Sequence, residues 1–171
     1  MLNQTVYKIE ETGEDFEGKF MYKHMILTTE QYQDILNNNI RIDELAVNIQ
    51  VDFISVLRND KINFMHTTSP SNKEFILNNG LKIKYDEFFD LGLGIYAIKK
   101  DSLQGLENLK TFVAEGYEDE EILIITGYYT GSYTECIYGS NHEGYIVLFD
   151  NVDSKNITNF NIMLVDDFLF M

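Results

Sequence analysis

The chain has 171 residues, of which 44% are hydrophobic and 13% aromatic, so it has ample material for a buried core and is not a disordered polymer. Its formal net charge of −15, from 28 acidic and 13 basic residues, opposes direct binding to nucleic acid. The single cysteine excludes an intramolecular disulfide, and no apolar stretch is long enough to cross a membrane.

The opening residues carry neither the basic run nor the apolar run of a signal peptide, so we expect a cytoplasmic protein. The richness in Asn, Ile, Lys and Tyr is typical of an A/T-rich genome, and we expect a bacterial cell or a phage-infected host. An acidic surface of this kind would attract a basic protein partner or imitate nucleic acid, although it also serves solubility alone.

Residues 1–60 are predicted to form a helical portion that packs on the rest of the chain. A short helix is expected in TTEQYQDILNN, with Thr28 or Thr29 capping its first turn. An amphipathic helix is predicted in DELAVNIQVDFISVLRND, because its apolar residues recur at mixed three- and four-residue spacings. The β-branched residues of this second segment leave a strand as the alternative.

From residue 61 onward, strands alternate with short helices. Helices are predicted in SPSNKEFILNNG and SLQGLENLKTFVAEG, each ended by its last glycine. Strands are predicted in KINFMHTT, LKIKY, GIYAIK, EILIITGYY, GYIVLFD and NFNIMLVD, and the loop TGSYTECIYGSNHE has room for a further short strand. Residues 61–171 are therefore expected to form an α+β core, in one compact domain with residues 1–60.

Four segments place polar residues beside apolar strands: MHTTS, LGLGIYAIKKDS, the aromatic loop from Tyr128 to Tyr138, and NHEGYIVLF. In the first, Ile62, Phe64 and His66 lie on one face of the predicted strand, so a histidine extends an apolar row. Each segment by itself is more often structural, because glycines serve tight turns and a histidine at a strand end is commonly a satisfied core residue. Their order along the chain is what indicates a ligand site.

This ordered set resembles the ADP-ribosyltransferase superfamily, in the His-Tyr-Glu branch that includes diphtheria-toxin-like enzymes and poly(ADP-ribose) polymerases. The family's first motif, a strand ending in His-Gly-[Ser/Thr], corresponds to His66-Thr67-Thr68. The second, a Gly-[Ile/Leu]-Tyr strand, corresponds to Gly94-Ile95-Tyr96, and the third, a glutamate before a Tyr-Ile-Val strand, to Glu143-Gly144-Tyr145-Ile146-Val147. The resemblance covers residues 61–165 and implies a split, mostly antiparallel sheet or sandwich with short helices.

The resemblance implies an NAD-dependent mono-ADP-ribosyltransferase, which uses NAD as co-substrate and modifies a macromolecular acceptor, most simply a protein. Cleavage of the nicotinamide–ribose bond passes through a ribose cation, so Glu143 would hydrogen-bond a ribose hydroxyl and offset that charge. Tyr96 would stack on the nicotinamide ring, and His66 would hydrogen-bond a hydroxyl of the adenosine ribose. The implied cofactor-binding set also includes Thr67 and Ser102, at the nicotinamide amide, with Thr68 and Gly94.

Two departures from the family pattern bear on activity. Thr67 stands where the family usually has glycine, which crowds the nicotinamide pocket. Gly144 separates Glu143 from the Tyr-Ile-Val strand, and a slip of one residue turns a side chain to the opposite face of a strand. A bulge at Gly144 would return Glu143 to the pocket, and Glu135 is the reserve carboxylate. If neither carboxylate reaches the site, the alternative is an acidic inhibitor or binding protein, such as a phage anti-defence protein or nucleic-acid mimic, on a catalytically degenerate fold.

Other enzyme classes are less favoured. An RNA 2′-phosphotransferase of the same fold would need arginines to hold phosphate, and the chain has only Arg41 and Arg58. The three histidines lack the spacing and the cysteine support of a zinc site, so no metal is expected. Cys136 with His142 is left open as an alternative nucleophile and base.

Overall fold

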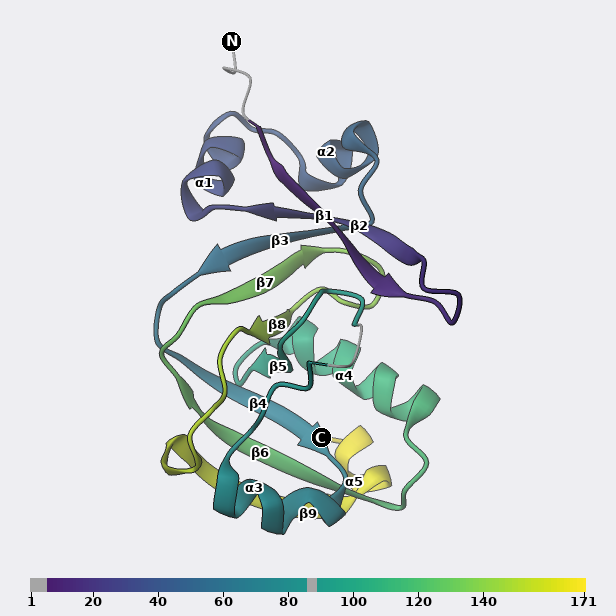
Figure 1. Cartoon of the computed structure of the whole chain (residues 1–171), viewed down its shortest axis with the longest axis vertical. Coiled ribbons are helices and arrows are strands. Elements are labelled where there is room, and N and C mark those ends of the chain that lie inside the picture. Colours follow the sequence, from purple (N-terminus) through teal and green to yellow (C-terminus); the bar gives the residue numbers. More distant parts are fainter. Residues whose placement is uncertain (1–5, 86–88) are drawn as a thin grey trace.

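The computed structural model of the chain describes residues 6–85 and 89–171 (Figure 1). Across these residues one sheet has the strand order β1-β2-β3-β7-β8-β5-β4-β6-β9. The strands are β1 (Lys8–Glu14), β2 (Phe20–Leu27), β3 (Phe53–Arg58), β4 (Ile62–Thr68), β5 (Ile95–Lys99), β6 (Glu121–Tyr129), β7 (Tyr133–Tyr138), β8 (Tyr145–Leu148) and β9 (Ile157–Leu164). Of these strand pairs, β2–β3 is parallel and the others are antiparallel. The expected α+β class with a mostly antiparallel sheet is confirmed.

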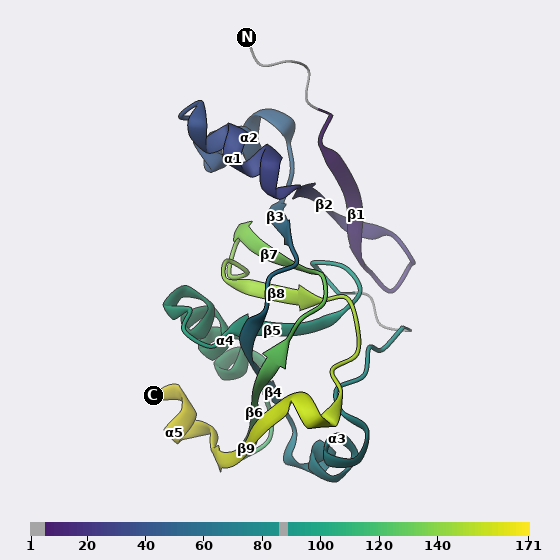
Figure 2. The same cartoon turned by 90° about the vertical axis from the view of Figure 1, so that its left-hand side faces the viewer.

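Short helices pack around this sheet (Figures 1 and 2). They are α1 (Thr29–Asn37), α2 (Ile42–Ile49), α3 (Lys73–Asn79), α4 (Leu103–Gly116) and α5 (Val165–Leu169). Helices α4 and α5 pack on the face that carries Met65 and Ile98. Helix α3 packs on the opposite face, which carries Phe64. Because neighbouring residues of β4 point to opposite faces, both faces of the sheet are covered and the centre of the sheet is buried.

Residues 6–60 combine strands with helices and do not form the expected helical portion. Three of the nine strands, β1, β2 and β3, lie in this part of the chain beside α1 and α2. Helix α1 forms where it is predicted, and the Thr28 and Gln31 side chains each accept a hydrogen bond from the other residue's main-chain N–H. This reciprocal cap satisfies two donors that a helix start would otherwise leave unpaired.

The second predicted helix is wrong in its second half. Helix α2 ends at Ile49, Gln50 takes a left-handed conformation with φ of 64°, and β3 begins at Phe53. Strand β3 lies between β2 and β7, and its first four residues are all buried. A strand buried on both faces has a continuous apolar run, and such a run also matches helical spacing. The strand alternative is therefore correct for residues 53–58.

Strands β1 and β2 have no counterpart among the predicted elements. β1, KIEETGE, is a polar strand at the edge of the sheet, where alternation of apolar and polar residues is weak. Of the predicted strands, LKIKY makes only an isolated bridge between Leu81 and Val152. The further short strand considered within the loop TGSYTECIYGSNHE is present, and it is β7.

Candidate functional site

His66 lies where β4 and β5 separate. The two strands pair at only two positions, the last being Met65–Ile98, and beyond it β4 continues beside β6 while β5 continues beside β8. The imidazole Nδ1 of His66 lies 2.6 Å from the carbonyl oxygen of Tyr96. A side-chain hydrogen bond therefore joins the two strands at the point where their main-chain ladder has ended.

The tautomer of His66 follows from this contact. A carbonyl oxygen only accepts, so Nδ1 carries the proton donated to Tyr96. Burial lowers the pKa of His66, the hydrogen bond to Tyr96 opposes this, and the charge of Lys84 lowers the pKa further. The ring is therefore neutral at neutral pH, and Nε2 presents a lone pair. Among the described residues no hydrogen-bond partner meets Nε2, so it is available to accept from a ligand hydroxyl.

Tyr96 is held by the loop that precedes β5. Its hydroxyl donates to the carbonyl oxygen of Gly92 and accepts from the main-chain N–H of Leu91, both at 2.8 Å. Its ring packs against Phe89, with ring centroids 4.8 Å apart and planes at 42°. Burial raises the pKa of Tyr96 above its ordinary value, so the phenol is neutral. Phe89 thus occupies one of the two faces on which a nicotinamide ring would stack.

The side chains of His66 and Tyr96 leave the sheet on opposite faces. Met65 and Ile98 are paired and share a face; His66 is one residue beyond Met65, and Tyr96 is two residues before Ile98. The two side chains therefore flank the separation of β4 and β5 from its two sides. A single ligand touches both only where the strands have diverged.

Glu143 lies in the connection between β7 and β8, residues 139–144, outside either strand. This connection is closed by a hydrogen bond from the Gly144 N–H to the Cys136 carbonyl, at 3.0 Å. The carbonyl oxygen of Glu143 accepts from Asn108 Nδ2 of α4 at 2.7 Å. Gly144 has φ of +91°, and a Cβ at this position would lie 2.5 Å from the main-chain nitrogen of Gly105. Contact with α4 therefore excludes any side chain at position 144, where the strict family register would put the carboxylate.

The Glu143 carboxylate lies within electrostatic range of a thiol that also influences Tyr96. Burial raises the pKa of Cys136 to about 12, and the charge of Glu143 contributes to this. Cys136 in turn contributes to the raised pKa of Tyr96, after burial and Asp90. Cys136 and Val147, which is paired with Tyr96, belong to one cluster with Tyr96. Glu143, in the connection before β8, and Tyr96, on β5, thus both act on the buried Cys136 thiol or are acted on by it.

Glu135, the reserve carboxylate, is committed to an ion-pair cluster. It lies 2.7 Å from Arg58 Nε and 3.3 Å from Lys99 Nζ, and all three side chains are about three-quarters buried or more. β7 is three strands away from β4, which places Glu135 about 14 Å from His66 at the usual strand spacing. With two cations bound and this separation, Glu135 is not part of the His66 site.

The other residues implied by the resemblance have local structural roles. Ser102 is the N-cap of α4, and its hydroxyl accepts from the Gly105 N–H at 3.0 Å. Gly94 has φ of +154°, and a Cβ there would lie 2.4 Å from Val147. Thr68 accepts from the Asn72 side chain at 2.9 Å at the end of β4. Thr67 continues β4 beside Ile124 of β6.

Three residues around the site carried no recognisable sequence signal. Phe89 packs on Tyr96 and Asn108 anchors Glu143, as described above. Asp90 accepts from His142 Nε2 at 3.1 Å, and this pair links the loop before β5 to the connection that carries Glu143. The loop is also tied to β1, where the Gly13 N–H donates to the Phe89 carbonyl at 3.0 Å. Such contacts join residues distant in the chain, so no local motif marks them.

Cys136 does not have the environment of a nucleophile. The thiol is buried, its raised pKa keeps it protonated, and Sγ donates to the Tyr138 carbonyl at 3.3 Å. His142 directs its two ring nitrogens to Asp90 and to the carbonyl of Ser140. Within residues 6–85 and 89–171, no group of three or more His, Cys, Asp or Glu residues is placed to hold a metal ion.

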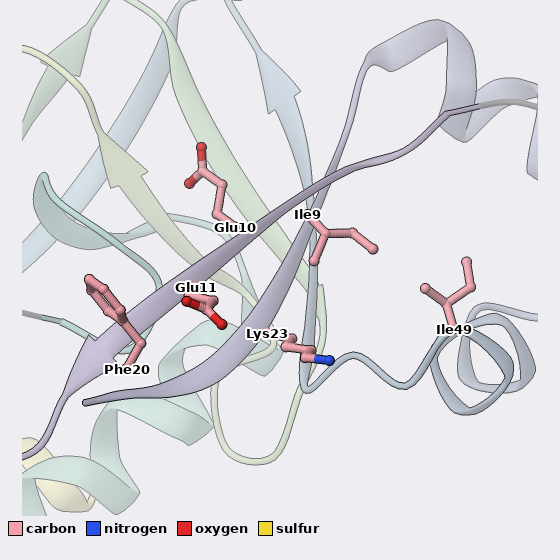
Figure 3. A pocket seen from close by; sticks show the side chains of 6 residues that line it. All are labelled: Ile9, Glu10, Glu11, Phe20, Lys23 and Ile49. Carbon is pink, nitrogen blue, oxygen red and sulfur yellow. The ribbon is translucent and has the colours of Figure 1, made fainter.

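Two concave regions lie on the N-terminal part of the molecule, away from His66, Tyr96 and Glu143. The larger, of about 740 Å³, is lined by Ile9, Glu10, Glu11, Phe20, Lys23 and Ile49 (Figure 3). The smaller, of about 350 Å³, is lined by Val6, Lys8, Ile26, Leu27, Thr28, Gln31, Leu57 and Phe149. Neither region is lined by His66, Tyr96 or Glu143.

Comparison of the chain with models of protein families, with curated proteins and with solved structures finds no match. None of the helices in the described residues is long and apolar enough to span a membrane.

Proposed function

We propose that the chain binds NAD where β4 and β5 separate and acts as an NAD-dependent mono-ADP-ribosyltransferase on a macromolecular acceptor, most simply a protein. The observation that carries this proposal is the hydrogen bond from His66 Nδ1 to the Tyr96 carbonyl, at 2.6 Å. It brings the first two motif residues together and leaves His66 Nε2 as an acceptor. A ribose hydroxyl is the type of donor that a neutral imidazole nitrogen accepts from.

The proposed reaction exchanges one bond at the ribose C1′. The bond from C1′ to the nicotinamide nitrogen breaks, and its electron pair leaves with nicotinamide. The acceptor's nucleophile forms the new bond to C1′, and its proton is lost to water. Glu143 offsets the positive charge that develops on the ribose between these events, as carboxylates do in glycoside cleavage.

The contact of Phe89 with Tyr96 gives the loop before β5 a part in this proposal. Stacking of nicotinamide on Tyr96 requires Phe89 to leave the exposed face of the ring or to form the second side of a sandwich. The Tyr96 hydroxyl bonds to Leu91 and Gly92, so the same loop fixes the ring that would receive the ligand. NAD binding is therefore expected to change the environment of Phe89.

Two substitutions of His66 separate the link to Tyr96 from the ligand contact. In His66→Asn, the amide nitrogen takes the place of Nδ1 and keeps the link to Tyr96, but no acceptor remains at the position of Nε2. In His66→Gln, the amide reaches the position of Nε2 and loses the link. NAD binding measured by calorimetry should weaken at least about tenfold in His66→Asn, the loss of one good hydrogen bond.

Transfer is tested with NAD labelled in its adenylate half and a bacterial lysate, following nicotinamide release and labelled protein. Glu143→Gln should reduce transfer by about a hundredfold or more while NAD still binds. Glu115→Gln is the matched control, because Glu115 is exposed on α4. Absence of nicotinamide release and of labelled acceptor with the wild-type chain would refute the transferase proposal.

A second candidate is favoured by the contact of Gly144 with Gly105. Because α4 excludes a side chain at position 144, the chain has no carboxylate in the strict family register. The second candidate is an acidic binding protein that uses this fold without turnover. This candidate predicts that the wild-type chain binds NAD or a partner protein but releases nicotinamide no faster than background. Glu143→Gln would then leave that rate unchanged.

A further inference from the structure

The main chain of Ile9 and Glu11, on the outer edge of β1, meets no hydrogen-bond partner among the residues that the structure describes. β1 is the end strand of the sheet and borders the molecule in Figure 2. Lys23 of β2 is opposite Glu11, and its main-chain N–H and C=O are directed to Asp52 in front of β3, at 2.9 and 2.8 Å. In an antiparallel pair, two residues opposite each other either both direct their main-chain N–H and C=O toward the partner strand or both direct them away from it. The main-chain groups of Glu11 therefore point away from β2.

A second contact supports the same alternation. The Gly13 N–H points away from β2 and donates to the Phe89 carbonyl at 3.0 Å. Because inward and outward groups alternate along a strand, Glu11 and Ile9 share the outward direction of Gly13. The outer edge of β1 thus already binds one chain segment at Gly13. Among the described residues no main-chain hydrogen bond from another element reaches Ile9 or Glu11.

The larger concave region is lined by residues of β1, β2 and α2 and therefore lies beside this edge strand. Figure 3 shows its lining side chains spread along β1 and β2, with Ile9 and Lys23 directed toward Ile49 of α2. Ile9 is 45% exposed and Phe20 is 51% exposed, which leaves apolar surface uncovered on both strands. Glu11 is opposite Lys23 on the side of β1 that carries Ile9, whereas the Glu10 carboxylate is on the other side of β1 and lies 2.7 Å from Lys8 Nζ. The groove therefore combines exposed apolar side chains and the Glu11 carboxylate with a strand edge that no described segment pairs with at Ile9 and Glu11.

Charge indicates what kind of segment fits this groove. Residues 8–20 contain Lys8 and Lys19 against five acidic residues, which are Glu10, Glu11, Glu14, Asp15 and Glu17. Proteins commonly protect an edge strand with charged side chains or proline, and β1 carries three carboxylates, Glu10, Glu11 and Glu14, with Lys8 at its start and no proline. Two copies paired edge to edge through β1 would bring Glu10 and Glu11 close to their own copies, which like-charge repulsion opposes. A basic segment meets no such repulsion.

We propose that the edge of β1 and its groove form a docking surface for a basic, extended segment of a partner protein. The segment adds as a strand beside β1 and bonds to the main chain of Ile9 and Glu11. Side chains on one face of the added strand pack on Ile9 and lie beside Glu11. Those on the other face reach Glu10, where a lysine or arginine takes the place of Lys8. This surface is separate from the proposed NAD site and does not depend on it.

The test uses the isotope-labelled full chain and a capped heptapeptide of alternating lysine and valine as the probe. Binding should shift the amide resonances of Ile9 and Glu11 and slow their hydrogen exchange. A heptapeptide of alternating glutamate and valine is the control probe and should not bind. High salt should weaken binding of the lysine probe, because charge pairs at the surface are screened.

Three variants locate the contact. Ile9→Pro removes only an outward N–H, which an edge strand tolerates, and should weaken binding by about tenfold. The double change Glu10→Lys and Glu11→Lys should weaken it by about tenfold or more. Glu120→Lys, at an exposed position before β6, is the matched charge control and should leave binding within about threefold. Thermal unfolding of each variant checks that the fold is kept.

Two results would overturn the proposal. The first is that the lysine probe does not bind, or that it shifts residues outside β1, β2 and α2 and is indifferent to Ile9→Pro. The second is that the chain alone forms a concentration-dependent dimer that Ile9→Pro abolishes, because the occupant would then be a second copy of this chain. Sedimentation velocity over a range of concentrations distinguishes the second result.

Discussion

His24 is a buried, neutral histidine whose protonation should oppose folding. Its side chain has no exposed surface, and Nε2 lies 2.7 Å from the Ser55 hydroxyl. Nδ1 is buried and has no hydrogen-bond partner among the described residues. Burial lowers the pKa of His24 from 6.5 to about 4, against a smaller opposing effect of Glu10. A charge on this ring would have no partner in the core.

The magnitude follows from linkage between protonation and folding. The unfolded chain binds a proton at His24 with a pKa of about 6.5, whereas the folded chain does so only near pH 4. Stability is therefore full well above pH 6.5 and is lost as pH falls toward 4. The loss from this one side chain is about 2 kcal/mol at pH 5 and about 3 kcal/mol at pH 4.

The measurement is the free energy of urea unfolding at pH 7.5 and pH 5.0, for the wild type and His24→Gln. Glutamine keeps a hydrogen-bonding group near Ser55 but has no titrating ring. The wild type should lose about 2 kcal/mol more than the variant between the two pH values, because other groups titrate alike in both. An equal pH dependence in the two proteins would refute the assignment of a depressed pKa to His24.

Three further substitutions test the packing described above, each by urea unfolding unless stated otherwise. Gly144→Ala should destabilise the fold by about 3 kcal/mol, because its Cβ would meet the Gly105 nitrogen and its φ is +91°; Gly116→Ala, with open space around it, is the control and should cost nothing. Glu135→Gln should cost about 2 kcal/mol, because Arg58 and Lys99 would lose a partly buried partner; a neutral result would contradict the ion-pair cluster. Burial alone would lower the pKa of His142, but its bonds to Asp90 and Ser140 and the Asp90 charge raise it. The stabilising pair is therefore complete below pH 6.5 and lost as pH rises, and Asp90→Asn should lower the His142 pKa in an NMR titration.

Much of the fold beyond residue 61 was predictable because local patterns and tertiary environment agree there. β4, β5, β6 and β8 each carry short apolar runs bounded by turn residues, and α4 begins at a serine cap. The N-terminal part was predicted poorly for the opposite reason. The run from residue 43 to 60 satisfies helical spacing throughout, and only burial of Phe53 and Ile54 between β2 and β7 makes its second half a strand.

The candidate site was also predictable only in part. The amino-acid order suggested that His66 and Tyr96 act together, and the structure places the His66 ring against the Tyr96 carbonyl. The amino-acid order did not indicate that the two side chains lie on opposite faces of the sheet, because this depends on the pairing of Met65 with Ile98. The packing of Phe89 on Tyr96 and the hydrogen bond from Asn108 to the Glu143 carbonyl could not be predicted from local sequence patterns either.

By itself, the sequence determined the composition of the core, the acidic charge, and the helices and strands whose patterns are local. Such features depend on neighbours a few residues apart, and the chain order specifies those neighbours directly. Only the tertiary structure decided that β1 is the end strand of the sheet, that Glu135 is paired with Arg58 and Lys99, and that α4 excludes a side chain at Gly144. These outcomes rest on contacts between segments tens of residues apart, where sub-ångström packing and strand register select which groups meet.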